Sequence, residues 1–255
     1  YLNAGAGPAA SEARLAARGA TIAYESHVVS RDLDVDVPAG VFTAIVGPNA
    51  CGKSTLLRAL ARLHRPTRGA VLLDGADIAR LGTKEVARRV GLLPQSATVP
   101  GGMLVRDLVA RGRFPHQGLF RQWSQQDRQA VEEAMEMVGV TELAARPVDE
   151  LSGGQRQRVW ISLALAQGTE TILLDEPTTF LDLAHQVDIL QLCRRLNADG
   201  RTVVAVLHDL NQAARCAEHM IVMHDGRVRT TGSPRRILTA DLIKEVFGLA
   251  VVIAP

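Results

Sequence analysis

Along most of the chain, short runs of apolar and β-branched residues alternate with stretches whose apolar residues recur at helical spacing. The strand-like runs cover residues 41–47, 69–75, 90–95, 171–175, 202–208 and 219–232. A helical stretch at 53–63 follows the first of them directly, and Pro66 and Gly69 mark its end. Strands that alternate with helices in this way predict an α/β fold with a largely parallel sheet.

The pattern changes between residue 96 and about residue 150, where strand-like runs disappear. Residues 127–140 have helical periodicity with Gly139 as the expected stop, and residues 112–123 form a loop interrupted by Gly and Pro. We interpret this part as a helical insertion into the α/β core. Near the end of the chain, Asp225-Gly226 predicts a hairpin, and residues 234–248 predict a closing helical segment.

These changes predict an α/β core made of two separated parts of the chain, residues 21–95 and 159–238. A helical subdomain at 96–158 lies between them. Residues 1–20 are rich in Ala and Gly without the apolar core of a signal peptide, and we expect a flexible segment there. Residues 239–255 complete the chain as a C-terminal helical segment and tail.

Composition narrows the functional classes. The chain has 255 residues, of which 47% are hydrophobic, and 29 Lys and Arg against 27 Asp and Glu give a net charge of +2. This balance gives no reason to expect a nucleic-acid partner. The cysteines at 51, 193 and 216 include no CxxC pair, which argues against a disulfide framework or a zinc site and fits a reducing compartment. Because no apolar run reaches the roughly 18–20 residues of a membrane span, any span would come from other chains.

The clearest chemical motif is GPNACGKST at residues 47–55, which matches G-x-x-x-x-G-K-[ST] with a strand before it and a helix after it. The glycines at 47 and 52 allow the backbone to curl around phosphate. Lys53 supplies a charge to the β- and γ-phosphates, and Ser54 offers a hydroxyl to Mg²⁺. Thr55 and the helix N-terminus add further donors.

Polar residues also end several apolar strands. Asp175 and Glu176 follow one strand, where Asp175 is suited to hold Mg²⁺ through its water shell and Glu176 to accept a proton from attacking water. His208 ends another strand and is placed to donate to a γ-phosphate, although a lone histidine there is more often a core residue. Gln95 ends a third strand and carries no information by itself.

A second phosphate-binding pattern, LSGGQ, begins at Leu151. It places Ser152, Gly153 and Gly154 just ahead of a helical stretch, where free N–H groups and missing side chains favour an anion. One chain therefore carries two such patterns.

Taken together, these motifs resemble the ATP-binding subunit of ABC transporters over nearly the whole chain. The matching positions, in order, are Tyr24, 47–55, Gln95, 151–155, 171–177, Asp182 and His208. The resemblance implies a RecA-like P-loop NTPase core with an N-terminal antiparallel β portion and MgATP hydrolysis. It implies catalytic roles for Glu176, His208, Lys53 and Gln95, and Mg²⁺ contacts from Ser54, Gln95 and Asp175. The nucleotide would be bound by Tyr24, Gly47, Pro48, Asn49, Ala50, Cys51, Gly52, Lys53, Ser54, Thr55, Ser152, Gly153, Gly154, Gln155 and Asp182.

The resemblance also implies how the parts work together. Tyr24 would stack on adenine, although a strand aromatic is by itself more often a core residue. Gln95 would contact Mg²⁺ or the attacking water and report to the membrane subunit. The LSGGQ residues would face the γ-phosphate held by a second, identical chain, and Asp182 would lie at that contact. Further expected partners are transmembrane permease subunits and, indirectly, an external binding protein, which implies a peripheral position on the cytoplasmic face of the inner membrane.

A narrower similarity, over residues 112–124 and 175–186, links the chain to importer ATPases for iron–siderophore complexes, close to those for haem and cobalamin. His116, Trp123 and His185 are interpreted as surface or packing residues. The alternatives are a soluble ABC ATPase, a P-loop kinase and a binding module without activity. A single cassette without a coiled-coil insertion argues against the soluble ABC ATPase. LSGGQ and His208 argue against the kinase. The intact set of Lys53, Asp175, Glu176 and His208 argues against an inactive binding module.

Two residues of the P-loop, Ala50 and Cys51, lead to predictions about backbone conformation and thiol reactivity. Ala50 stands where relatives often carry Gly, and we expect it to adopt a negative φ. The thiol of Cys51 lies close in sequence to Lys53 and a helix N-terminus, so we expect a lowered pKa and high reactivity for it.

Overall fold

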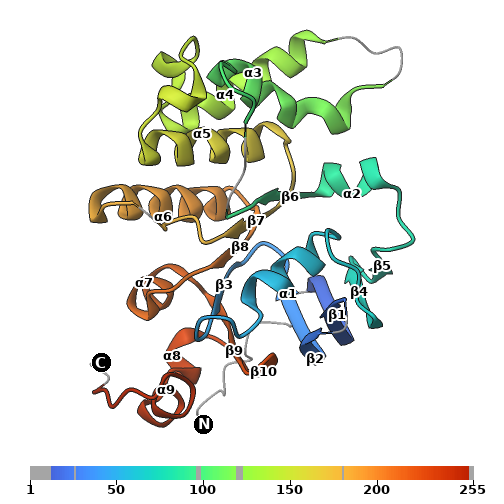
Figure 1. Ribbon diagram of the computed structural model, residues 1–255, viewed down its shortest axis with the longest axis vertical. Coiled ribbons are helices and arrows are strands. Elements are labelled where there is room, and N and C mark those ends of the chain that lie inside the picture. The colour runs from blue at the N-terminus through green and yellow to red at the C-terminus, as the bar shows by residue number, and fades with distance from the viewer. Residues whose placement is uncertain (1–12, 26, 96–98, 119–122, 180, 253–255) are drawn as a thin grey trace, which may run out of the picture.

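The computed structural model describes residues 13–25, 27–95, 99–118, 123–179 and 181–252 (Figure 1). Parts of several sequence-based expectations lie outside the described residues. They are residues 1–12 of the expected flexible segment, 96–98 at the start of the expected helical subdomain, 119–122 of the aromatic loop, Phe180 and the last residues 253–255.

The strands form two sheets. Their bounds are β1 Ala13–Tyr24, β2 His27–Pro38, β3 Phe42–Val46, β4 Arg68–Leu73, β5 Ala76–Asp77, β6 Val90–Leu93, β7 Thr171–Asp175, β8 Thr202–Val206, β9 His219–His224 and β10 Arg227–Gly232. The smaller sheet is antiparallel with the order β2-β1-β4-β5. In the larger sheet, with the order β10-β9-β3-β8-β7-β6, only the edge strand β10 pairs antiparallel. The predicted parallel sheet and the antiparallel portion are both present.

The central strands of the larger sheet are buried on both faces, which explains their unbroken apolar sequences. In β3, Phe42 and Ala44 pack into the core beneath the helices, whereas Ile45 packs into the core shared with the smaller sheet. In β7, Ile172 and Leu173 divide in the same way. Helical packing on one side and β packing on the other therefore hold the strand ends that carry the polar motifs.

The helices lie on both sides of the larger sheet. Their bounds are α1 Lys53–Leu60, α2 Thr83–Arg89, α3 Val105–Ala110, α4 Gln125–Val138, α5 Gly153–Ala166, α6 Leu183–Ala198, α7 Leu210–Cys216, α8 Pro234–Ile237 and α9 Ala240–Phe247, with 3₁₀ segments η1 Arg111–His116, η2 Thr141–Leu143 and η3 Val148–Glu150. Helices α3, α4 and α5 form a block at the top of Figure 1, whereas α1 lies beside β1 and β2. Helix α4 ends at Gly139, which has a φ of 69° as its expected stop requires.

The 3₁₀ segment η1 braces this helical block. The Arg113 guanidinium donates through Nε to Asp127 Oδ1 at 2.9 Å and through a terminal nitrogen to the Ala166 carbonyl at 2.8 Å. His116 Nε2 donates to the Gln167 carbonyl at 2.6 Å, in agreement with a packing role. Burial alone would raise the pKa of Asp127, but the hydrogen bonds from Ser124 and Arg113 outweigh it and hold that pKa at about 2. One segment thus ties the start of α4 to the end of α5.

Two expected boundaries differ from the structure. Residues 13–20 are not flexible, because they form the first part of β1, where Leu15, Ala17 and Ala20 are buried. Their small, apolar composition reflects close packing against the neighbouring strands. The expected end of the helical subdomain at residue 158 falls inside α5, which runs without a break to Ala166. In the described part of the chain, the helices are too short or too polar to cross a membrane.

Candidate functional site

The loop between β3 and α1 turns on backbone conformations that few residues adopt. Gly47 has a φ of 154° and Gly52 a φ of 99°. A Cβ at Gly47 would collide with the Met223 carbonyl oxygen and lie 2.8 Å from Cys51 Sγ. A Cβ at Gly52 would lie 2.6 Å from the Ser30 hydroxyl. Only glycine fits at these two positions, so the loop can bring its N–H groups close to a ligand.

Lys53 begins α1 with its charged end folded into this loop. Its Nζ donates to the carbonyl oxygens of Gly47 at 2.9 Å and Pro48 at 2.8 Å, and the residue is buried. The first N–H groups of α1 have no partner inside the helix. The loop therefore gathers a cation and several backbone donors around one point, which suits a phosphate.

The end of β7 supplies an acidic group beside the loop. Ser54 Oγ donates to Asp175 Oδ1 at 2.7 Å, and Asp175 is only 1% exposed. Its Oδ2 accepts no hydrogen bond from the described residues, and Arg58 Nη2 lies 3.8 Å away from it. Burial raises the pKa of Asp175, and the Ser54 hydrogen bond and Arg58 oppose the increase. A buried oxygen without a hydrogen-bond donor, next to a hydroxyl, has the chemistry of a hard-cation ligand.

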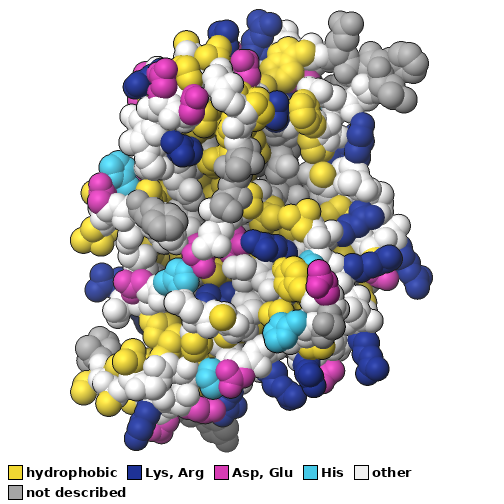
Figure 2. All heavy atoms as spheres, viewed as in Figure 1, with side chains coloured by type: hydrophobic (Ala, Val, Ile, Leu, Met, Phe, Trp, Pro, Cys, Tyr) yellow, Lys and Arg dark blue, Asp and Glu magenta, His cyan; other side chains and the backbone are white. Residues whose placement is uncertain are grey.

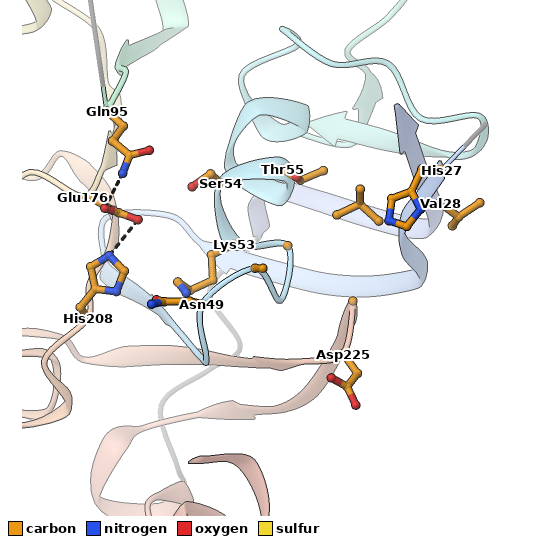
Figure 3. Close-up of a pocket in the computed structure, with 14 residues that line it drawn as sticks. His27, Val28, Asn49, Lys53, Ser54, Thr55, Gln95, Glu176, His208 and Asp225 are labelled. Carbon is orange, nitrogen blue, oxygen red and sulfur yellow. Dashed lines mark hydrogen bonds and ion pairs between the residues drawn. The ribbon is translucent and has the colours of Figure 1, made fainter. Parts of the chain in front are cut away.

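Glu176 is held at the meeting point of three strand ends (Figure 3). Gln95, after β6, donates through Nε2 to Glu176 Oε2 at 2.6 Å, and His208 Nε2, after β8, lies 2.8 Å from Oε1. Thr179 Oγ1 also donates to Oε2, at 3.2 Å. Glu176 itself has a φ of 54°. The parallel strands thus bring three polar residues together that lie far apart in the sequence.

Many of these groups line one cleft of about 690 Å³, whereas Asp175 and Thr179 are not among its lining residues. Of the residues expected at the site, Asn49, Ala50, Gly52, Lys53, Ser54, Thr55, Gln95, Glu176 and His208 line it. Its other wall was not foreseen from the sequence and consists of His27, Val28, Val29, Asp225 and Gly226 (Figure 3). The Asp225-Gly226 turn was recognisable as a hairpin, but nothing local indicated that the Arg31 N–H donates to the Gly226 carbonyl at 3.1 Å and holds the turn there.

Tyr24 lies at the edge of this region and is not among the described residues that line the cleft. It is 39% exposed and pairs across the β1–β2 hairpin with His27, which does line the cleft. Its ring packs against the ring of His64, with the centroids 4.3 Å apart. His64 Nε2 donates to the Ala23 carbonyl at 2.9 Å. Tyr24 is therefore a partly exposed aromatic beside the cleft rather than a core residue.

The LSGGQ residues occupy a different place, at the start of α5. Ser152 Oγ accepts from the Gln155 N–H at 3.2 Å, and Gln155 Oε1 accepts from the Ser152 N–H at 3.1 Å. A Cβ at Gly153 would meet nothing within 4 Å. Asp182 caps α6 by accepting from the His185 N–H at 2.9 Å. Within one chain, these residues form a surface separate from the cleft.

Two expectations for the P-loop are wrong. Ala50 has a φ of 60°, because the turn at this point needs a left-handed residue and the alanine accommodates it. Cys51 is 5% exposed, and burial raises the pKa of its thiol despite the opposing charge of Lys53. The thiol packs into the apolar core beneath the loop, so it lacks the exposure that a reactive cysteine needs.

The sequence of this chain is similar to that of known proteins. Residues 30–179, more than half of the chain, match the sequence profile of the ABC transporter family. The chain belongs to the ABC transporter family. The ferric enterobactin transport ATP-binding protein FepC of Escherichia coli (strain K12) is 53% identical over 244 residues, which cover 95% of this chain and 90% of that relative. This agreement confirms the resemblance drawn from the sequence motifs.

Solved structures agree with the fold. An inward-facing metal-chelate type ABC transporter matches with a TM-score of 0.81 and 32% identity, covering 93% of this chain and 90% of that one. The dimeric bacterial ABC transporter cassette MJ0796 matches with a TM-score of 0.77 and 30% identity, covering 87% and 99%. The RecA-like P-loop fold is confirmed, and the chain is an ATP-binding subunit and an ATPase.

Proposed function

We propose that this ABC ATPase energises the import of iron–siderophore complexes by hydrolysing MgATP. The observation that carries the chemistry is the Glu176 carboxylate, held between Gln95 and His208 and opening onto the cleft that Lys53 enters. The similarity to the ferric enterobactin protein over 95% of the chain supports the cargo class. Cargo would not touch the described residues, since it would pass through other subunits.

Each residue of the cleft has a separate task in this proposal. Lys53 exchanges its two loop carbonyls for oxygens of the β- and γ-phosphates, and the N–H groups at the start of α1 bind the remaining charge. Glu176 takes a proton from the attacking water, and His208 donates to the γ-phosphate. Tyr24, beside His27, stacks on the adenine. General-base help of this kind is typically worth about 10²–10⁴-fold in rate.

The residues present fit a magnesium ion. In the part of the chain that the structure describes, no group of three or more His, Cys, Asp or Glu side chains is arranged to hold a metal alone. Mg²⁺ usually takes one or two protein ligands together with phosphates and water. Ser54, Asp175 and Gln95 would hold it, and this assignment is supported by Asp175 Oδ2, which accepts no hydrogen bond from the described residues. When bound, Mg²⁺ neutralises charge that develops on the phosphates.

The separation of LSGGQ from the cleft supports a shared site. A cleft with one open side and a donor surface elsewhere on the same chain fit together when two copies pair head to tail about a two-fold axis. Ser152, Gly153, Gly154 and Gln155 of one copy would then face the nucleotide of the other, with Asp182 at the contact. The dimeric state of the MJ0796 cassette, at 30% identity, supports this arrangement.

The remaining partners follow from the exposed part of the helical block. Phe114, 58% exposed on η1, and Trp123 offer apolar surface for a permease loop. We propose that the subunit sits on the cytoplasmic face of the inner membrane through the permease, and that an external binding protein acts on it indirectly. Figure 2 shows positive and negative side chains intermixed over the face in view.

The catalytic assignment is tested by Glu176→Gln. Turnover should fall by about 10²–10⁴-fold while MgATP still binds, because only proton transfer is removed. Release of inorganic phosphate without an added acceptor separates an ATPase from a kinase. Turnover near that of the wild-type protein would remove Glu176 from the base role.

The cargo and the shared site need separate experiments. With the permease in vesicles, binding proteins loaded with a ferric siderophore, haem or cobalamin are compared for stimulation of ATPase activity. Strongest stimulation by the siderophore form supports the proposal, and preference for another ligand reassigns the cargo. For the shared site, a Ser152→Arg chain is mixed with a Lys53→Ala chain, which leaves one intact site per mixed dimer. Activity no higher than that of either mutant alone would argue against sharing.

A further inference from the structure

We propose that Thr179 is a positioning residue that holds Oε2 of Glu176 and thereby leaves Oε1 as the atom that takes the proton from water. This inference rests on the proposed role of Glu176 as general base. It adds a residue that neither the P-loop, the strand-end acids nor the LSGGQ motif includes.

The contact is built into the turn that follows β7. The Thr179 N–H donates to the Glu176 carbonyl at 3.2 Å, which closes the turn over residues 176–179. The Thr179 hydroxyl donates to Glu176 Oε2, also at 3.2 Å. The left-handed φ of Glu176, 54°, makes the chain turn back at this point. Thr179 therefore lies close enough to Glu176 for its N–H and its hydroxyl both to donate to that residue. Since the backbone bond already closes the turn, the hydroxyl is free to act on the carboxylate.

The three donors around Glu176 differ in where they come from. Gln95 follows β6 and His208 follows β8, so each reaches the carboxylate from another part of the sheet. Both have a second task in the proposed function, Gln95 at Mg²⁺ and His208 at the γ-phosphate. Thr179 lies three residues after Glu176 in the same turn and is not needed elsewhere. Its hydrogen bond is therefore the one that can persist when nucleotide draws the other two away.

This arrangement distinguishes the two carboxylate oxygens. Oε2 carries both the Gln95 and the Thr179 bonds, whereas the partner of Oε1 among the described residues is His208. Once His208 turns to the γ-phosphate, Oε1 is left without a donor and Oε2 keeps one. The proton of the attacking water then moves to Oε1 as the water oxygen bonds to phosphorus. The bond from phosphorus to the β–γ bridging oxygen breaks, and its electrons leave with ADP. Thr179 gives up no proton in this step.

The test compares Thr179→Val, which keeps the shape without the hydroxyl, with Thr179→Ser, which keeps the hydroxyl. We expect Thr179→Val to lower kcat about tenfold, which corresponds to roughly 1.4 kcal/mol. KM and the Kd for MgATP should change less than twofold, because the hydroxyl touches the base and not the nucleotide. Thr179→Ser should stay within threefold of the wild-type kcat. The melting temperature of each variant confirms that it is folded.

A second measurement separates positioning from a structural role. In the Glu176→Gln background, single-turnover rates with and without Thr179→Val should be equal within twofold, because the atom being positioned is gone. A full tenfold loss in that background would overturn the proposal, as would a wild-type kcat for Thr179→Val or an equal loss for Thr179→Ser. If Glu176→Gln itself kept wild-type turnover, the base role would fail and this inference with it. An inactive Glu176→Gln beside a fully active Thr179→Val would overturn only the role of Thr179.

Discussion

The two regions of this chain that we propose to bind phosphate are built in opposite ways. At the P-loop, Lys53 binds the carbonyls of Gly47 and Pro48, and Ser54 binds the buried Asp175. At the start of α5, the side chains of Ser152 and Gln155 each accept from the other's backbone N–H, and the space beside Gly153 is open. The side chains of Lys53 and Ser54 in the first region are thus held by the loop and the core, whereas the second region is a helix start facing outward.

This difference separates the P-loop, which lies in a formed cleft, from the start of α5, which we propose to complete a site only on a partner chain. The P-loop and the strand ends already gather a cation, backbone donors and acids around one cleft. At the start of α5, the space beside Gly153 is open within the described chain. In the proposed pairing, a second chain would supply the opposing wall, which would explain why one sequence carries both motifs. The comparison also predicts where substitutions damage folding and where they damage only the pairing.

The largest contrast is expected between two glycines. Gly47→Ala should cost roughly 4 kcal/mol of unfolding free energy or prevent folding, because its Cβ has no room beside Met223 and Cys51. Gly153→Ala should be neutral or stabilising by about 0.5–1 kcal/mol, since it lies in a helix with open space around it. Denaturant unfolding measures both. Equal destabilisation by the two substitutions would remove the proposed difference between the regions.

The helical block that presents LSGGQ depends on a buried ion pair, and its loss should have the next largest effect. Asp127→Asn leaves Arg113 without its charge partner and should cost roughly 3 kcal/mol. The folded pKa of Asp127, about 2, is lower than its ordinary value of 3.8. Its contribution is therefore complete above about pH 4 and is lost as the pH falls toward 2.

Unfolding free energies measured between pH 7 and pH 2.5 check this prediction. The loss of stability on acidification should be smaller in Asp127→Asn than in the wild-type protein, because that carboxylate can no longer be protonated. The matched control is Asp188→Asn, an exposed aspartate on α6, which should change stability by less than about 0.5 kcal/mol. An acid sensitivity identical in Asp127→Asn and wild type would exclude this ion pair as its source.

Ser152→Ala tests the smaller energy of the α5 surface. The substitution removes the hydroxyl that accepts from the Gln155 N–H, and helix caps of this kind are worth about 1 kcal/mol. Stability should fall by that amount, while ATPase activity should fall much more if the hydroxyl also meets the partner's nucleotide. Nucleotide binding by a separate chain should be unchanged. A loss of binding in the single chain would place Ser152 in the chain's own cleft.

The sequence predicted best where chemistry is local. The P-loop match, the acids after β7 and the Asp225-Gly226 hairpin each depend on neighbouring residues, and the structure has all three in place. What could not be predicted depends on distant packing. The wall formed by His27–Val29 comes from a hairpin brought against another strand, and the Thr179 contact depends on the direction of a single hydroxyl.

The errors at Cys51 and at residues 13–20 both come from packing that the local sequence does not reveal. In the sequence, Cys51 lies close to Lys53 and to a helix N-terminus, and this proximity led us to predict a low pKa for its thiol. The structure instead turns the thiol into the core, where burial has the larger effect and raises the pKa. Residues 13–20 were misjudged because a strand of small residues packed between two others has no alternating pattern to reveal it.

The smallest expected effect concerns Ala50, which has a left-handed φ of 60° in a loop that otherwise uses glycine for such turns. An alanine in this conformation costs about 1–2 kcal/mol, whereas a glycine has no Cβ to strain but loses about 0.5–1 kcal/mol of chain entropy on folding. Ala50→Gly should therefore raise stability by only about 0.5 kcal/mol. The affinity for MgATP should change less than threefold, because the N–H groups keep their places. Thermal unfolding with and without MgATP measures both quantities. A loss of stability on Ala50→Gly would mean that the methyl group makes a favourable contact that outweighs its strain.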